Sequence, residues 1–191
     1  MAGEIGIKGQ RVNNIQAETV TVQQGGADEI HANTVTLSQA GANHIEANVV
    51  ELRQAGAQQV KGQTITVRQG VIVQAKADTV SLTQGGVVLA EADQANLTVA
   101  TAGVVWSKGQ VALDQSVARA ILTGGEVSMD QSGAGVLLAR RVSIGSNSNV
   151  LLLLAGRVDG QVNAVFGPLA GAAFGAAFAI VLALLWRFVR R

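Results

Sequence analysis

The sequence predicts an all-β protein, a single-stranded β-solenoid (β-helix) of about eleven rungs followed by a C-terminal hydrophobic α-helix. Three observations support this fold class. Aliphatic residues recur every 15 or 16 residues, they alternate with other residues inside each repeat, and a long uncharged stretch follows Pro168. We therefore expect a β-solenoid over residues 4–166 and a hydrophobic helix with a basic tail over residues 168–191.

The repeat unit reads x-V-x-L-x-Q-x-G-A-x-x-I-x-A-x, with positions numbered 1 to 15, and residues at one position in successive units form a column. The position-2 column is Ile5, Val20, Val35, Val50, Ile65, Val80, Ala95, Val111, Val127, Val142 and Val158. Alternation places positions 2 and 4, 7 and 9, and 12 and 14 on the inner side, which indicates three short edges per rung. A flattened, two-sided coil fits nearly as well. A unit this short cannot bury its apolar residues alone, so successive rungs must stack.

The corners of the coil carry residues that are typical of turns. Position 8 is often glycine, as in Gly26 and Gly41, and position 15 is often an Asn or Asp such as Asn33; both favour a positive φ. Position 6 is mostly glutamine, and its members are Gln24, Gln39, Gln54, Gln69, Gln84, Gln115 and Gln131. Amides stacked one rung apart can form a hydrogen-bonded ladder. This structural interpretation is favoured over a ligand-binding stripe.

Outward positions 11 and 13 are charged in the first half of the chain. Glu29, His31, His44 and Glu46 lie in adjacent rungs, which allows either a metal site or a solvated ladder of paired charges. The ladder explains the same residues, so we expect no metal and no cofactor.

The same outward positions become apolar in the second half of the chain. The predicted interaction surface consists of Val104, Trp106, Leu122, Val136, Leu138, Leu151 and Leu153. A strand that is apolar on both faces is normally covered. The chain's own C-terminal helix, another subunit and lipid are all possible covers.

Residues 169–186 carry no charge, a length at the lower edge of what spans a bilayer. A helix here would place small residues in one packing stripe, formed by Gly171, Gly175, Ala179 and Ala183. The predicted membrane-interface residues are Trp186, Arg187, Arg190 and Arg191. No signal sequence is readable at the N-terminus, so a spanning helix would carry arginines across the membrane, against the positive-inside tendency. Insertion into a membrane and packing on protein both remain open.

Composition and motifs argue against several functions. Net charge is +1, 3% of residues are aromatic and cysteine is absent, so neither a nucleic-acid surface nor a disulfide framework is indicated. The repeat has no long insertions that could build a cleft, and no catalytic motif is present. We therefore expect no enzymatic activity and no nucleic-acid partner.

The phrase I-x-A-x-x-V-x-L, which begins at Ile30 and again at Ile45, resembles the bactofilins over roughly residues 4–160. The resemblance implies a polymer-forming bacterial β-helix that associates with membranes, and it carries over no functional residue. In this chain the rung is shorter than is expected for that family, and the hydrophobic segment follows the solenoid.

The leading functional hypothesis is a non-enzymatic, cytoskeleton-like scaffold. It would self-associate as a homo-oligomer or filament through an open strand edge near residue 5, and its C-terminal helix would tether it to the cytoplasmic face of a membrane. The alternative is an accessory or binding subunit of a larger membrane complex, docked through the apolar edge and the helix. A surface-displayed stalk is a third class, which would need an export route.

Overall fold

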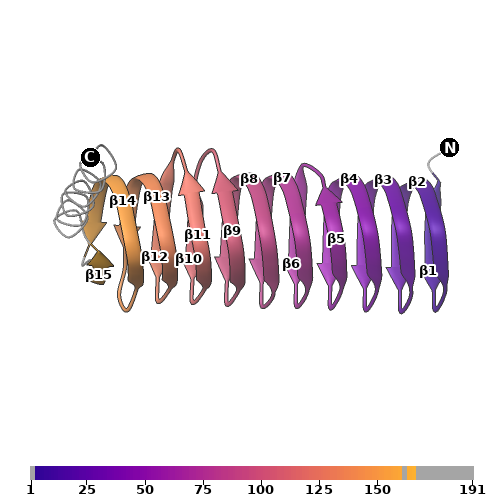
Figure 1. Ribbon diagram of the computed structural model, residues 1–191. Coiled ribbons are helices and arrows are strands. Elements are labelled where there is room, and N and C mark those ends of the chain that lie inside the picture. Colours follow the sequence, from indigo (N-terminus) through magenta and orange to yellow (C-terminus); the bar gives the residue numbers. More distant parts are fainter. Residues whose placement is uncertain (1–2, 161–162, 167–191) are drawn as a thin grey trace, which may run out of the picture.

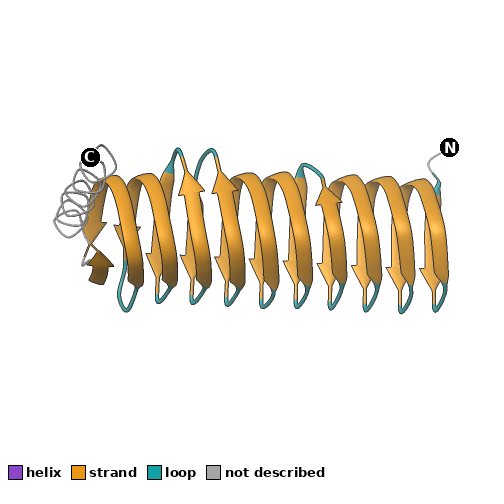
Figure 2. Ribbon diagram, in the orientation of Figure 1, coloured by secondary structure: helices purple, strands orange, loops and turns teal. Residues whose placement is uncertain are grey.

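A computed structural model describes residues 3–160 and 163–166, and side chains up to residue 160. This part of the chain is a parallel β-solenoid that contains strands and no helix (Figure 1 and Figure 2). The predicted C-terminal helix over residues 168–191 lies outside the described residues.

In the described residues, fifteen strands pair side by side, all parallel where they pair, in one continuous coil of about ten turns. The strands are β1 (Glu4–Lys8), β2 (Arg11–Gln23), β3 (Gly26–Ser38), β4 (Gly41–Arg53), β5 (Gly56–Lys61), β6 (Thr64–Arg68), β7 (Val71–Thr83), β8 (Gly86–Thr98), β9 (Thr101–Ser107), β10 (Val111–Asp114), β11 (Val117–Thr123), β12 (Glu126–Asp130), β13 (Gly133–Ile144), β14 (Asn149–Gly160) and β15 (Asn163–Phe166). The sequence predicts about eleven rungs, and the described residues form about ten turns.

The strand register confirms the predicted position-2 column. Val20 pairs with Val35, and Val35 pairs with Val50, so each residue lies beside its equivalent 15 residues later. The column also continues through the longer repeats, where Val111 pairs with Val127 across 16 residues. Every rung therefore covers the apolar side chains of its neighbours, as the short repeat requires.

Each turn of the coil has three straight segments. The pairing of β2 with β3 is interrupted at Asn13 and Asp28 and again at Glu18 and Asn33. It ends before Gln24. Three interruptions per turn favour the three-edged cross-section over a flattened coil with two sides. The tight loop at the third interruption recurs along one edge of the rod (Figure 2).

The core is a thin aliphatic column along the rod axis. Val20, Val35 and Val50 are fully buried, and Ile30 and Ile45 at position 12 are 0% and 2% exposed. Among the residues whose side chains are described, no aromatic ring is buried in this core. The low aromatic content follows, because two small side chains per edge leave no space for a ring.

The left-handed residue of each turn is at position 6, and the prediction that positions 8 and 15 have positive φ is wrong. Positive φ values near 50° occur instead at Gln24, Gln39, Gln54, Gln69, Gln84, Val99, Gln115, Gln131 and Asn147. The reason is that the tight loop needs one left-handed residue directly after position 5, whereas position 8 already belongs to the next strand.

The glutamine ladder is confirmed for five of the seven predicted glutamines, Gln24 to Gln84. Each amide Nε2 donates to the Oε1 of the glutamine one rung further along, from Gln24 to Gln39 at 3.3 Å and from Gln39 to Gln54 at 3.1 Å. The ladder continues from Gln54 to Gln69 at 3.2 Å and from Gln69 to Gln84 at 3.1 Å. These side-chain bonds offset part of the cost of holding a non-glycine residue at positive φ.

Val99 occupies this column without an amide and has φ 51°. A β-branched residue is strained there, and Val99 is 48% exposed, so little burial is lost on truncation. We expect Val99→Gly to raise the free energy of unfolding by about 1 kcal/mol in urea denaturation. The control is Val88→Gly, at an exposed strand position, which should lower stability by about 0.5–1 kcal/mol. Destabilisation by Val99→Gly would contradict the strain.

Candidate interaction surfaces

An apolar strip runs along one face of the second half of the rod, over β9, β11, β13 and β14. One row joins Trp106, Leu122, Leu138 and Leu154, and the other joins Val104, Ala120, Val136 and Leu152. We call these eight residues the apolar strip. Trp106 is its most exposed member at 63%.

The prediction that Leu153 belongs to the interaction surface is wrong, because the structure buries this residue. It is 5% exposed and pairs with the core residue Leu137, whereas Leu154 is 53% exposed and takes the outward place. The last long repeat has its extra residue in the loop before β14, where Asn147 has φ 54°. In the two preceding 16-residue repeats the extra residue lies at the corner after position 14. The prediction did not include this difference, so its register for β14 is shifted by one residue.

The other predicted surface residues are exposed. Val104, Trp106, Leu122, Val136 and Leu138 lie in the two rows of the strip. Leu151 is also 53% exposed, at position 10 on the corner beside the strip. Leu152 and Leu154 were not predicted as surface residues, since four consecutive leucines allow either register.

The same face is polar in the first half of the rod. His31 Nε2 lies 2.9 Å from Glu29 Oε1, and its Nδ1 lies 3.5 Å from Glu46 Oε2. Lys76 Nζ lies 2.8 Å from Glu91 Oε1. These contacts join exposed side chains within one rung or between neighbouring rungs. Among the described residues, no group of three or more His, Asp or Glu side chains is arranged to hold a metal ion.

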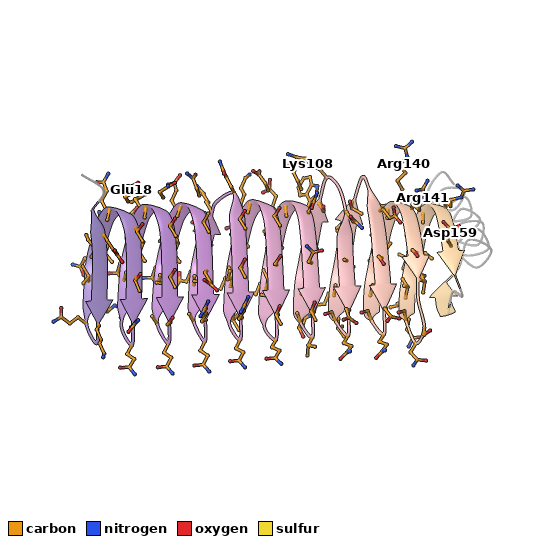
Figure 3. The ribbon with its side chains drawn as sticks, turned by 180° about the vertical axis from the view of Figure 1, so that it is seen from behind. Glu18, Lys108, Arg140, Arg141 and Asp159 are labelled. Atoms are coloured by element: carbon orange, nitrogen blue, oxygen red, sulfur yellow. The ribbon has the colours of Figure 1, made fainter. Side chains whose placement is uncertain are left out.

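Basic residues border the apolar strip on both sides. Arg119 lies on the corner at position 10, and Lys108 and Arg140 lie on the corner at position 15. Figure 3 shows Lys108 and Arg140 on the same edge of the coil as Glu18, which is near the other end. This corner therefore changes from acidic to basic along the rod. Lys108 Nζ lies 3.4 Å from Asp93 Oδ1 at the point of change.

The N-terminal end of the coil exposes its core. Ile5 is 37% exposed, whereas Val20 and Val35 in the same column are fully buried. Within the described residues, β1 pairs with β2 alone, so the backbone groups of its other edge have no strand beside them. An edge of this kind can accept another strand.

The described surface has several hollows. The one along β2, β3, β4 and β5 is floored by the position-8 glycines Gly26, Gly41 and Gly56, beside Arg11 and Asn43. None of the residues that line it is a nucleophile beside a general base.

The fold places this chain in the class of parallel β-solenoid proteins. No protein-family model, curated protein or solved structure matches it.

Within the described residues there is no apolar helix long enough to cross a bilayer. The predicted packing residues Gly171, Gly175, Ala179 and Ala183 lie outside this part of the chain. The same holds for the predicted interface residues Trp186, Arg187, Arg190 and Arg191.

Proposed function

We propose that this protein is a non-enzymatic scaffold that associates with itself through the N-terminal end of its solenoid and is tethered to the cytoplasmic face of a membrane by residues 168–191. The observation that carries self-association is the exposed Ile5 beside the open edge of β1. Stacking a second rung on this end would bury Ile5 and Ile7 and provide partners for the backbone groups of the edge.

The sequence of β1 is self-complementary. In Glu4-Ile5-Gly6-Ile7-Lys8, an antiparallel pairing centred on Gly6 sets Glu4 opposite Lys8 of a second copy. The same pairing sets Ile5 opposite Ile7, so the two apolar cores become continuous. A two-fold symmetric dimer has this property, since each contact occurs twice.

A charge exchange tests the association. Glu4→Lys and Lys8→Glu should each weaken dimerisation of the full chain in detergent by about tenfold, because each places like charges opposite one another at two sites. The double variant should restore it. Analytical ultracentrifugation measures the dissociation constants, and Lys76→Glu, in mid-rod, is the control. A wild-type chain that stays monomeric at all concentrations would refute self-association, and failure of the double variant to recover would refute the antiparallel geometry.

The membrane tether is supported by the uncharged residues 169–186 and the arginines that follow them. The resemblance to bactofilins supports the same combination of polymer and membrane association. Removing residues 168–191 should release the protein from membranes in a flotation assay.

The alternative, an accessory subunit of a membrane complex, is favoured by the exposed apolar strip. It would show as a second protein that copurifies in mild detergent and is lost on Gly171→Leu and Gly175→Leu.

A further inference from the structure

The apolar strip can approach a medium without water at little cost in hydrogen bonding. The strands beneath it, β9, β11, β13 and β14, are central strands of the coil with a parallel neighbour on each side, and the pairing of β14 with β15 reaches Leu152. Backbone groups in such a face are already paired, which is the condition for contact with hydrocarbon. The side chains are Val, Leu, Ala and one exposed Trp, and a Trp ring is favoured at a membrane–water interface.

The charges that border the strip select among its possible occupants. Arg119 and Arg140 are exposed on opposite corners, and neither makes an ion pair with another described residue. The third border charge, Lys108, makes an ion pair with Asp93 at the start of the strip. An occupant that covers the strip therefore meets positive charge on both sides.

Neither of the occupants that this chain could itself supply has the complementary charge. A second copy packed strip to strip would bring Arg119 and Arg140 against the same arginines. Residues 168–191 contain three arginines and no Asp or Glu. In a lipid bilayer, negative headgroups lie above an apolar layer. The apolar layer can contact the strip while the headgroups bind the basic residues of its border.

We propose that the apolar strip lies on an anionic lipid bilayer, so that the second half of the rod rests along the membrane. This inference rests on the proposed tether, which would hold the strip close to the bilayer. The first half of the same face carries Glu46, Lys61 and Lys76 and stays in water. Its open end at β1 remains accessible for association.

Trp106 reports the contact directly. The chain has two tryptophans, so Trp186→Phe leaves Trp106 as the single fluorophore in the full-length protein. The protein is reconstituted into vesicles of phosphatidylcholine and phosphatidylglycerol that contain brominated lipid. We expect bromine to quench Trp106 and its emission to shift to the blue in these vesicles.

Two matched variants control the measurement. Moving the reporter to Lys61 in the polar half of the column, with Trp106→Phe and Lys61→Trp, should abolish quenching. Arg119→Gln with Arg140→Gln should lower the ratio of docked to undocked strip by about fivefold for each arginine. Arg53→Gln with Arg68→Gln removes the same charge at position 5, on the corner that does not border the strip. This variant should leave quenching unchanged.

The outcomes separate this inference from the tether. If the chain floats with vesicles and Trp106 stays unquenched, the strip does not touch lipid and only this inference fails. A Trp106 that is shielded from water in neutral and anionic vesicles alike, without quenching, would indicate residues 168–191 as the cover. A disulfide between two Trp106→Cys chains would indicate a second copy. A chain that does not bind vesicles at all would refute both the tether and the strip contact.

Discussion

Replacing Leu52 by Asp should abolish cooperative folding of the rod. Leu52 is 0% exposed and is flanked in its column by Leu37 and Val67. The substitution removes a buried side chain worth about 2–5 kcal/mol and places a carboxylate in a core that offers it no partner. The loss should exceed about 5 kcal/mol, comparable to the whole stability of a typical domain. Urea denaturation followed by circular dichroism measures it.

Two further variants separate the effect of losing the buried side chain from the effect of adding a carboxylate. Leu52→Ala should still fold, with a loss of about 2–5 kcal/mol. Val49→Asp introduces the same carboxylate on the same strand at a side chain that is 45% exposed, and it should cost less than about 1 kcal/mol. Equal damage from Val49→Asp and Leu52→Asp would contradict the assignment of inner and outer columns.

Adding a single methyl group at Gly85 should distort the stacking of two rungs. A Cβ at this residue would lie 2.2 Å from the carbonyl oxygen of Gly70, which is backbone and cannot rotate away. Gly85→Ala should therefore lower the free energy of unfolding by about 1–3 kcal/mol, because the rungs must separate locally. Thermal denaturation measures the change.

Gly41 is the matched control. A Cβ there meets its nearest atom, the oxygen of Gly56, only at 3.9 Å, and its φ is not positive. Gly41→Ala should be neutral or should raise stability by up to about 1 kcal/mol, through a lower entropy of the unfolded chain. If Gly41→Ala is as harmful as Gly85→Ala, close rung contact is not the cause.

Spacing in the sequence was enough to predict most of this fold. In a parallel solenoid each residue pairs with its own equivalent in the next rung, so the repeat interval is also the strand register. The position-2 column and the glutamine ladder were predictable for this reason.

The predictions that the structure contradicts failed for local reasons. A 16-residue interval does not say which corner receives the extra residue, and the apolar run 151–154 fits two registers, which is why Leu153 was placed on the wrong side. The left-handed residue was expected at glycine because glycine adopts positive φ without strain. The structure instead has positive φ at Gln24 and its column, and hydrogen bonds between side-chain amides join this column from Gln24 to Gln84. The basic border of the strip was also missed, because Arg119 and Arg140 lie on different corners.

The uniform pairing of residues 15 apart has an evolutionary consequence. Loss of residues 34–48, one whole unit, would join Asn33 to Val49 with every remaining column still aligned, and duplication of the unit would do the same in reverse. Such a gene can change the length of its product in steps of roughly 4.8 Å while the cross-section stays fixed. Recombination can therefore change the length of the rod under selection while the packing of its core stays the same.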